Sequence, residues 1–439
     1  MPQSLTIILG KAVRYVAKLR GGGSALPGLF VERIDASFVP KTLAQLPHGV
    51  VVISGTNGKT TTTKMVVALL ESQGLKVFTN RTGSNFVRGV AAALLGDIDT
   101  KGRLDADIAV LELDEAHAVK FVEIVPPRYS LLLNVMRDQL DRFGEIDATA
   151  QMLEKIALAT TDTIVINRED ARVRRIADVL SSSQQVRYFG LAPSLASRFP
   201  SDDELLSTST KTPRTARGTK ATTTTGPAHQ QPPVADVLLK DFNEKGAAFT
   251  IAGKDVVTPL KLRGIYNIYN SAAALALART IVPAASLNGL LGALSTVTPA
   301  FGRGETLTVN GTPLELVLVK NPAGFRLGLE SYTHDGYATM IAINDNYADG
   351  RDMSWLWDVD FTQLIDHPVS LTGIRAYDMA LRLQYDEVNC EHINTNLAEA
   401  LHEFIAAHPK GPKRIYCTYT AMLTLRKELS KITRVENIS

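Results

Sequence analysis

A short segment at residues 50–65, VVVISGTNGKTTTTKM, constrains the fold more than any other. It predicts a buried strand that runs through a glycine-containing loop into a helix. Glycines let the backbone wrap a phosphate with its N–H groups, and the helix N-terminus adds partial positive charge. The loop is shorter than the usual Walker spacing, since the residue five before Gly58 is Ile53. The predicted nucleotide-binding residues are Gly55, Thr56, Asn57, Gly58, Lys59, which can reach the terminal phosphates, Thr60, whose hydroxyl can hold Mg²⁺, and Thr61.

Apolar runs alternate with helical patterns from this segment to about residue 180 and predict an α/β fold. The runs are GVVVIS, KVFTN, IAVLEL, YSLLLNV and TIVIN. Near-continuous apolar strands separated by helices are typical of a parallel sheet that is covered on both faces. We expect a helix and lead-in at residues 1–45, a central domain at residues 46–302, and a smaller α/β domain at residues 303–439.

The stretch from residue 182 to 234 interrupts this pattern, because it is rich in Thr, Ser, Pro and Lys. Its few apolar residues cannot offset the chain entropy lost on folding, so residues from about 190 to 233 are predicted to form a disordered insertion. The runs VADVLLKDF, AAFTIAG and VVTPLKL then predict an antiparallel hairpin unit.

Composition excludes several classes of protein. Lys and Arg number 47 against 45 for Asp and Glu, and this balance argues against a nucleic-acid partner. The only cysteines, Cys390 and Cys417, cannot form a disulfide framework or a four-thiolate zinc site, so a cytoplasmic location is expected. No apolar run approaches the roughly 18 residues of a transmembrane helix.

Residues 5–19 predict an amphipathic helix with Lys11, Arg14 and Lys18 on one face. Two interpretations remain open. The helix packs on the central domain with its charges in water, or the basic face contacts anionic headgroups at the inner face of the membrane.

Polar side chains follow several predicted strands, at the edge of the sheet where ligands bind in open α/β folds. Glu112, Asp114 and Glu115 follow IAVLEL, and a carboxylate there can complete a Mg²⁺ site beside a phosphate. A solvated, helix-capping acidic turn is the alternative. The other candidates are Asn134, Asp138 and Asp141 after YSLLL, Asn167 and Asp170 in TIVINRED, Asn267 and Asn270 in GIYNIYN, and Arg303 in FGRGE.

The C-terminal domain adds an acidic and aromatic segment, NDNYADGRDMSWLWDVDF. It contains Asp345, Asp349 and Asp352 directly after a predicted strand, and the only tryptophans, Trp355 and Trp357. An Asp-Gly turn alone would need no further explanation, but acidic and aromatic residues at this density favour a site or an interface. The eight histidines show no metal-ligand spacing, and Cys417 in IYCTYT reads as a buried residue rather than a nucleophile.

In chain order these motifs resemble those of the Mur ligase family: GTNGKTT, Glu112, residues 134–141, Asn167, GIYNIYN and FGR. The similarity extends to the MurT branch of that family, because NDNYADGRDMSWLWDVDF, TGIRAYDMALRLQYD and TYTAMLTLR resemble its C-terminal domain. The tyrosine in GIYNIYN also matches that branch, where amino-acid-adding members usually have histidine. The resemblance covers most of residues 35–430 and implies a Mur ligase-like central P-loop ATPase domain with a smaller C-terminal α/β domain.

The resemblance implies a two-subunit enzyme. MurT-type chains pair as a heterodimer with GatD, a glutamine amidotransferase-like subunit that releases ammonia from glutamine. With ATP and Mg²⁺, the ligase-like chain activates the α-carboxyl of D-glutamate in the lipid II stem peptide as an acyl phosphate. Ammonia then gives D-isoglutamine.

The same resemblance assigns roles to single residues of this chain. It makes Lys59 and Glu112 catalytic, and Thr60 and Glu112 the Mg²⁺ ligands. Asp349 corresponds to an aspartate that completes a catalytic triad with the Cys and His of GatD. The implied nucleotide contacts beyond the phosphate loop are Asn167, Asn267, Asn270 and Arg303.

The chain departs from the family pattern at several positions. Many MurT proteins have a four-cysteine zinc ribbon in the central domain, and this chain has no cysteine there, so no zinc is expected. Gln139 stands where amino-acid-adding ligases have a metal-binding histidine, and Lys320 where they usually have aspartate. Lys155 falls near their carbamylated lysine, but its spacing does not support the assignment. A UDP-binding domain is not expected before the phosphate loop.

Three other functions remain open. A folylpolyglutamate synthetase-like ligase would use the same acyl phosphate with an amino acid as nucleophile, but it gives no role to DNYADGRD. A regulatory P-loop GTPase would use Asn167 and Asp170 to read guanine, although LELDEAH lacks the DxxG motif of that class. A non-catalytic ATP-binding scaffold is the third.

Overall fold

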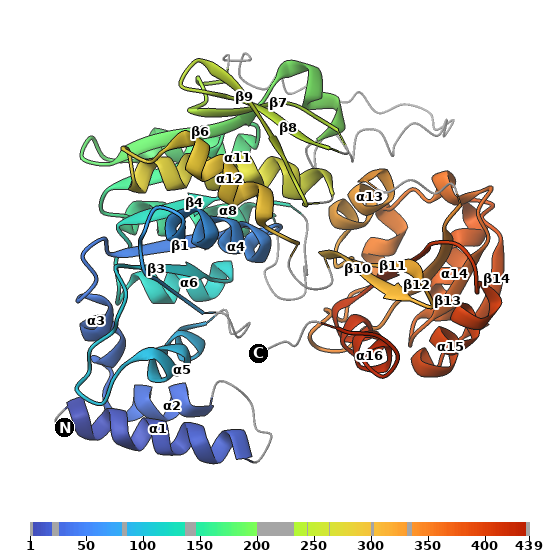
Figure 1. Cartoon of the computed structure of the whole chain (residues 1–439), viewed down its shortest axis with the longest axis horizontal. Helices are drawn as coiled ribbons and strands as arrows, with labels where there is room; N and C mark the ends of the chain where they lie inside the picture. The colour runs from blue at the N-terminus through green and yellow to red at the C-terminus, as the bar shows by residue number, and fades with distance from the viewer. Residues whose placement is uncertain are drawn as a thin grey trace, which may run out of the picture.

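The computed structural model describes residues 3–19, 26–80, 86–136, 146–199, 232–243, 245–262, 264–299, 303–331 and 336–435. Two separate β-sheets organise these residues, one of nine strands and one of six (Figure 1). The first strand of the second sheet begins at Arg303. The predicted α/β class is therefore confirmed, with one sheet on either side of residue 302.

The nine-stranded sheet has the order β2-β3-β1-β4-β5-β6-β7-β8-β9. Strands β2 to β7 are parallel, which confirms the prediction for β1 to β5 and adds β6 and β7 to the parallel part, and β7, β8 and β9 are antiparallel. The antiparallel unit joins the same sheet, because β7 pairs in parallel with β6. The strands are β1 (Val50–Ser54), β2 (Val77–Thr79), β3 (Ile108–Glu112), β4 (Tyr129–Leu132), β5 (Thr163–Asn167), β6 (Gln185–Leu191), β7 (Val237–Asn243), β8 (Gly246–Ile251) and β9 (Lys254–Pro259).

Helices cover both faces of this sheet, because successive side chains of each central strand point to opposite faces. In β1, Val51 and Ile53 contribute to one core, and Val50 and Val52 to the other. The first core lies under α4 (Lys59–Glu71), α11 (Ile265–Ile281) and α12 (Leu287–Thr296). The second lies under α2 (Leu26–Ile34), α3 (Phe38–Leu43), α5 (Val87–Asp97), α6 (Glu115–Val122), α8 (Ile146–Ala159) and α9 (Ala171–Arg175), with α1 (Gln3–Leu19) packed outside α2 and α5.

The predicted start of the insertion is wrong by about ten residues. Residues 190 and 191 belong to β6, and a 3₁₀ helix, η2 (Pro193–Arg198), follows. Leu191 and Leu195 are buried in the core together with Phe189, so this stretch has enough apolar surface to pack. The short helix η1 (Ile176–Val179) precedes it. Residues 200–231, which contain most of the rest of the predicted insertion, lie outside the described residues.

Deletion of residues 207–230 is expected to leave activity nearly unchanged and to shift the melting temperature by no more than about 2 °C. The segment lacks the apolar residues needed to pack, and the free energy of loop closure changes only slowly with loop length. Differential scanning calorimetry and a turnover assay measure the two quantities. A loss of about 10 °C would contradict the prediction, because it would assign a folded, stabilising structure to the segment.

The six-stranded sheet has the order β10-β11-β15-β12-β13-β14, in which only the β10–β11 pair is antiparallel. Its strands are β10 (Arg303–Val309), β11 (Thr312–Leu318), β12 (Ala338–Ala342), β13 (Val369–Thr372), β14 (Cys390–Asn394) and β15 (Lys413–Cys417). Its helices are α13 (Pro322–Ser331), η3 (Ser354–Asp358), η4 (Thr362–Leu364), α14 (Ala376–Tyr385), α15 (Leu397–Ala407) and α16 (Tyr419–Leu429).

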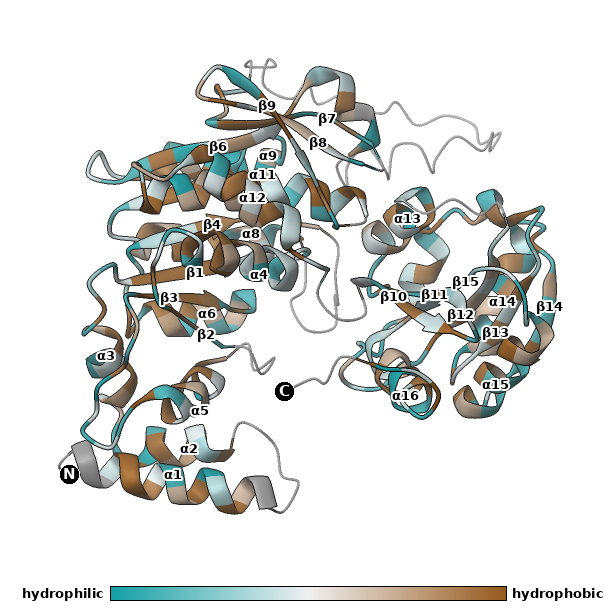
Figure 2. Ribbon diagram, in the orientation of Figure 1, coloured by the Kyte–Doolittle hydropathy of each residue, from teal (hydrophilic) through white to brown (hydrophobic). Residues whose placement is uncertain are grey.

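The runs LELVLVK, YATMIAIN, HPVSLTG and RIYCTYT predict the four inner strands of this sheet, but β10 and β14 are missed. Helical patterns at residues 323–332, 376–384, 394–408 and 420–431 predict all four α-helices. Both missed strands lie at the edges of the sheet. Edge strands have one solvated side, and CEHIN in β14 has no buried residue. Figure 2 shows the contrast, with brown along the inner strands and teal on outward-facing segments.

Candidate functional site

The loop after β1 has the geometry of a phosphate-binding loop. Gly55 and Gly58 have φ values of +131° and +90°, which side chains with a Cβ rarely adopt, and Gly58 precedes the first turn of α4. Asn134, at the end of β4, holds the loop in this shape. The backbone N–H of Asn57 donates to Asn134 Oδ1 at 2.8 Å, and Asn134 Nδ2 donates to the carbonyl of Asn57 at 3.0 Å.

Lys59 lies at the centre of the loop and is 8% exposed. Its Nζ donates to the carbonyl oxygen of Gly55 at 2.5 Å and lies 3.4 Å from Glu115 Oε1. The ammonium group therefore lies within the loop itself, where it can neutralise phosphate charge. Sequence reasoning did not pick out Glu115, the first residue of α6, because the carboxylates Glu112 and Asp114 lie beside it. Its pairing with Lys59 spans 56 residues.

Thr60 and Glu112 are brought together as predicted for a Mg²⁺ site. Thr60 Oγ1 donates to Glu112 Oε1 at 2.7 Å. Adjacent oxygen ligands of an octahedral Mg²⁺ lie about 2.9 Å apart, given bonds of about 2.1 Å, so one cation can bind both with little movement. Asn80 fixes the backbone of Glu112, because its amide exchanges hydrogen bonds with the N–H and the C=O of that residue.

Asn270 reaches the phosphate loop from α11. A Cβ atom built on Gly58 would lie 2.0 Å from Asn270 Nδ2, so the two residues are in close contact. Asn270 is 1% exposed, and its Nδ2 has no hydrogen-bond partner among the described residues. An unpartnered buried donor costs free energy, and a nucleotide phosphate would supply the missing acceptor. The loop, the Thr60–Glu112 pair and Asn270 therefore fit ATP with Mg²⁺.

Replacing Gly58 with alanine is expected to abolish nucleotide binding, whereas the same change at Gly74 is not. Both glycines have a positive φ, +90° and +87°, so either substitution costs about 1–2 kcal/mol in backbone strain. Only at Gly58 does the added Cβ meet another group, because nothing lies within 4 Å at Gly74. Titration with a fluorescent ATP analogue measures both dissociation constants, and an equal loss in the two variants would contradict the close contact with Asn270.

Asn167 and Asp170, which the sequence also places near a nucleotide, hydrogen-bond to other parts of the protein. Asn167 is 6% exposed; its Nδ2 donates to the carbonyl of Leu133 at 2.8 Å, and its Oδ1 accepts from Tyr269 Oη at 2.6 Å. Asp170 caps α9 and accepts from the N–H of Val135. These contacts tie β4, β5 and α11 together, and they leave neither side chain open to a base.

The remaining candidates from this part of the sequence are only partly described. Asn267 lies in the first turn of α11, and the backbone of Arg303 begins β10. The side chain of Arg303 lies outside the described residues, as do Asp138, Gln139 and Asp141.

The C-terminal domain contacts the phosphate loop directly. Asn321 Nδ2 donates to Asn57 Oδ1 at 3.1 Å, and Asn57 Nδ2 lies 3.4 Å from Asn321 Oδ1. Asn321 is 1% exposed and also accepts from the N–H of Gly324 in the first turn of α13. A small apolar cluster of Met136, Ala323 and Leu327, with Tyr266 packed against it, lies at the same junction. Sequence reasoning missed Asn321, although it stands beside Lys320 in VKNPAG.

Asp349 lies in the loop after β12 and is only 2% exposed. Its Oδ1 accepts from the backbone N–H of Thr420 at 2.7 Å, and its Oδ2 accepts from the Thr420 hydroxyl at 2.5 Å. Because Thr420 lies in the first turn of α16, the carboxylate satisfies an otherwise unpaired helix N–H. Burial raises the pKa of Asp349, although these hydrogen bonds work in the opposite direction. In this single chain the carboxylate is directed at α16 and not at the surface.

The three aspartates of this segment do not converge on one site. Asp345 pairs with Arg375 at 2.7 Å, and Asp352 accepts from the N–H of Ser354. The tryptophans also differ: the partly buried Trp355 ring packs against Phe325 at the edge of the core, whereas Trp357 is 48% exposed. Trp357 therefore offers more exposed surface to a partner than Trp355 does.

Cys417 is fully buried, and burial raises the pKa of its thiol well above the ordinary value. This agrees with the prediction that it is no nucleophile. Within the described residues, no cluster of three or more His, Cys, Asp or Glu side chains is arranged to hold a metal ion. None of the described helices is long and apolar enough to cross a membrane.

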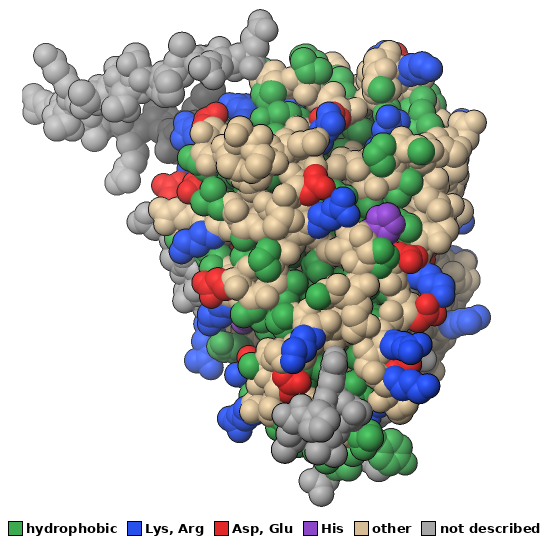
Figure 3. Space-filling model, turned by 90° about the vertical axis from the view of Figure 1, so that its left-hand side faces the viewer, with side chains coloured by type: hydrophobic (Ala, Val, Ile, Leu, Met, Phe, Trp, Pro, Cys, Tyr) green, Lys and Arg blue, Asp and Glu red, His purple; other side chains and the backbone are tan. Residues whose placement is uncertain are grey.

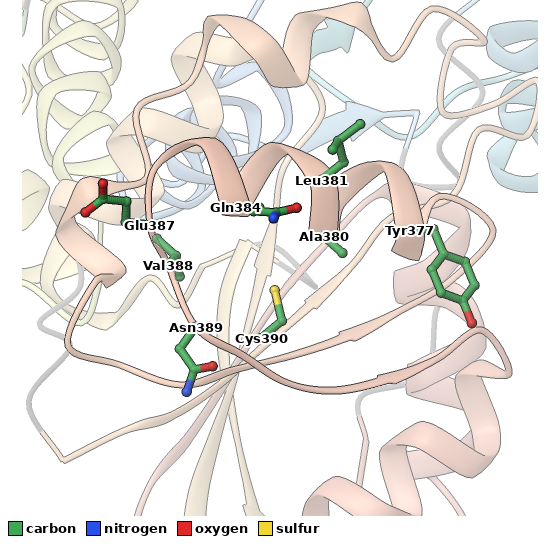
Figure 4. Close-up of a pocket in the computed structure, with 8 residues that line it drawn as sticks. All are labelled: Tyr377, Ala380, Leu381, Gln384, Glu387, Val388, Asn389 and Cys390. Atoms are coloured by element: carbon green, nitrogen blue, oxygen red, sulfur yellow. The ribbon is translucent and has the colours of Figure 1, made fainter.

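A hollow of about 630 Å³ lies on the C-terminal domain between α14 and β14, away from the phosphate loop (Figure 4). It contains no pair of groups suited to catalysis. The residues that line it are Tyr377, Ala380, Leu381, Gln384, Glu387, Val388, Asn389 and Cys390.

Models of two families match the chain: the Mur ligase middle domain over residues 53–278 and the MurT ligase C-terminal over residues 318–422. A "Lipid II isoglutaminyl synthase (glutamine-hydrolyzing) subunit MurT" from Streptococcus pneumoniae is 30% identical over 97% of this chain and 97% of its own length.

Two solved structures share the fold. MurF from Acinetobacter baumannii has a TM-score of 0.66 at 18% identity, covering 92% of this chain and 80% of its own. MurF ligase from Thermotoga maritima in complex with ADP has a TM-score of 0.64 at 16% identity, covering 90% and 84%. From the family models and the 30% identity over nearly the full length, the chain belongs to the Mur ligase family and, within it, to the MurT family.

Proposed function

We propose that this chain is the synthetase subunit of a two-subunit amidating ligase. It uses ATP and Mg²⁺ to activate the α-carboxyl of D-glutamate in the lipid II stem peptide, and ammonia from a GatD-like glutaminase partner converts that carboxyl to the amide. The observation that carries this proposal is the Thr60–Glu112 contact of 2.7 Å beside Lys59 in a closed phosphate loop. The name of the Streptococcus pneumoniae relative supports the substrate and the amide donor.

The chain's own residues would act mainly by electrostatics and positioning. ATP, when bound, supplies the phosphoryl group that makes the carboxyl an acyl phosphate. Lys59 would stabilise the negative charge that develops on the phosphates, Thr60 and Glu112 would hold the metal ion, and Asn270 would donate a hydrogen bond. The Asn57–Asn321 pair joins this loop to the C-terminal domain, so bound nucleotide and the orientation of that domain would be coupled through this junction.

Replacing Glu112 with glutamine is expected to raise the Mg²⁺ concentration for half-maximal activity by about tenfold. The substitution keeps the shape of the side chain but removes the charge that attracts the cation. Asn80 holds the backbone of Glu112, so the amide side chain should stay in place. An Mg²⁺ titration at saturating ATP measures the shift. An unchanged titration curve with normal ATP binding would exclude Glu112 as a metal ligand.

A partner surface is supported on the C-terminal domain. Helix α14 and Ile374, which precedes it, expose large apolar side chains at helical spacing. Trp357 packs edge-on against Tyr385 in α14, with ring centroids 5.2 Å apart. Tyr and Trp at such positions are typical of interface anchors. The Arg375–Asp345 ion pair connects this surface to the loop that contains Asp349. The α14 face consists of Ile374, Tyr377, Leu381, Tyr385 and Trp357, each between 48% and 71% exposed.

Asp349 would complete the triad of the partner's glutaminase site from this surface. In the single chain its carboxylate already accepts hydrogen bonds from Thr420. A histidine of the partner would therefore have to replace the Thr420 hydroxyl as the donor to Oδ2. Residues 345–350 would thus rearrange locally when the subunits associate.

Co-purification with a GatD-like subunit, followed by an assay of lipid II amidation, tests the proposed function. We expect amide formation that requires ATP, glutamine and both subunits. Incorporation of glutamate in place of ammonia would favour the folylpolyglutamate synthetase-like alternative, and a preference for GTP would favour the GTPase. Nucleotide binding without turnover in the complex would favour a scaffold.

A further inference from the structure

The ammonium group of Lys59 is occupied by acceptors of the protein itself. Its Nζ donates to the carbonyl oxygens of Gly55 at 2.5 Å and Thr56 at 3.3 Å, and it lies 3.4 Å from Glu115 Oε1. An ammonium group has three N–H donors, so these three acceptors account for all of them. A phosphate that binds to Lys59 must therefore displace one of them.

Glu115 is the charged member of these three acceptors, and its position in α6 keeps it at the loop. It is the first residue of the helix, where the N-terminus favours a negative charge. Its side chain is only 5% exposed, and among the described residues Lys59 is the only group that hydrogen-bonds to its carboxylate. If a phosphate draws the ammonium group away, the carboxylate stays buried beside the phosphate without that partner, which costs free energy.

Negative side chains outnumber positive ones where the described residues meet the loop. Glu112 contacts Thr60, and Glu115 contacts Lys59, so two carboxylates lie beside one ammonium group. Charges elsewhere largely cancel, since the net charge of the chain is +2 and the face shown in Figure 3 mixes basic and acidic side chains. The electrostatic field at the loop therefore depends mainly on the side chains that line it.

We infer that Glu115 makes the phosphate loop selective for the magnesium complex of ATP over metal-free ATP. Metal-free ATP brings its full negative charge to two carboxylates and one ammonium group. A Mg²⁺ ion held by Thr60 and Glu112 would offset the charge of the phosphates and of both carboxylates, so the penalty that Glu115 imposes would fall. The inference deepens the proposed function, because it assumes that ATP is the ligand of this loop.

Titration of the full-length chain with a fluorescent ATP analogue, in excess Mg²⁺ and in excess EDTA, tests the inference without substrate or partner. The wild type should bind roughly a hundredfold more tightly in Mg²⁺ than in EDTA. Glu115→Gln keeps the shape of the side chain and removes its charge. In this variant, binding in EDTA should tighten about tenfold, while binding in Mg²⁺ changes by less than about threefold.

The matched control is Glu123→Gln, the same chemical change at the other end of α6. Glu123 is exposed, so water and salt screen its charge, and both dissociation constants should match those of the wild type. Glu115→Asp separates charge from shape, because it retains the carboxylate and should keep most of the Mg²⁺ dependence. Loss of that dependence in Glu115→Asp would contradict a role for the charge.

Other outcomes would also overturn the inference. They are equal wild-type binding in Mg²⁺ and EDTA, and an unchanged EDTA constant in Glu115→Gln. Weaker binding of Glu115→Gln only in Mg²⁺ would make Glu115 a metal ligand. Equal weakening under both conditions, with a lower melting temperature, would make it a structural partner of Lys59.

The same titrations separate the inference from the proposed function. An absence of ATP binding under either condition would remove both. Binding constants as expected, in a complex that does not amidate lipid II, would leave the inference standing and remove the proposed function alone.

Discussion

Lys59→Ala is expected to lower ATP-dependent amidation by about 10²- to 10³-fold while the fold and the complex with the partner stay intact. Lys59 Nζ lies inside the loop, 2.5 Å from the carbonyl of Gly55. Fixed charges that face the charge developing during reaction are worth several kcal/mol. Steady-state kinetics with saturating glutamine measures the loss.

Lys76→Ala is the matched control for charge removal in the same domain. Lys76 lies in the turn before β2 and pairs on the surface with Asp105 at 2.6 Å, and such exposed pairs contribute little. We expect wild-type turnover in this variant. Wild-type turnover in Lys59→Ala as well would remove the assignment of the phosphate loop. A drop in the melting temperature of Lys59→Ala would instead point to the buried contact with Glu115.

Asp349→Asn is expected to abolish most glutamine-dependent amidation and the partner's glutaminase activity while ATP binding persists. The third member of a triad must orient a histidine and stabilise its positive charge, and an amide does neither well. Added ammonia should restore amidation at least in part, because formation of the acyl phosphate does not use the triad. Ammonia release and amide formation are measured separately on the same complex.

Asp360→Asn provides the control for the structural role of Asp349. Asp360 accepts from the N–H and the hydroxyl of Thr362 at 2.9 and 2.7 Å, the pattern that Asp349 makes with Thr420, but it is exposed. Either substitution keeps one acceptor oxygen and removes the charge and the second acceptor, so it should cost at most about 1 kcal/mol of stability. Equal loss of the ammonia-driven reaction in Asp349→Asn would place the residue in the ligase site. Untouched glutaminase activity would exclude the shared triad.

The inner strands and the phosphate loop were predictable because their signals are local. Each inner strand is a continuous apolar run, and the loop combines glycines, a lysine and threonines within seven residues. Glu112 was predictable because it ends such a run, and the ends of parallel strands meet at one edge of the sheet. The edge strands β10 and β14 were not predicted, since strands with one solvated side need no apolar run.

The contacts that complete the candidate site join residues far apart in the chain. Asn57 and Asn321 are separated by 264 positions, and Lys59 and Glu115 by 56. Nothing in the spacing of either pair predicts the contact. The burial of Asn167 against Tyr269 is of the same kind, because a polar residue at a strand end can face either a ligand or a neighbouring helix, and the packing of α11 decides which.

By itself, the sequence determined that this chain forms a covered parallel sheet with a phosphate loop at its edge. Each strand and the loop can be recognised from a short run of consecutive residues. Only the tertiary structure decided which polar groups meet there, which tryptophan stays at the surface, and that Asp349 is held by Thr420. It also decided that Glu115, among three neighbouring carboxylates, pairs with Lys59. These properties depend on which elements pack against one another, and each element's own sequence is compatible with more than one neighbour.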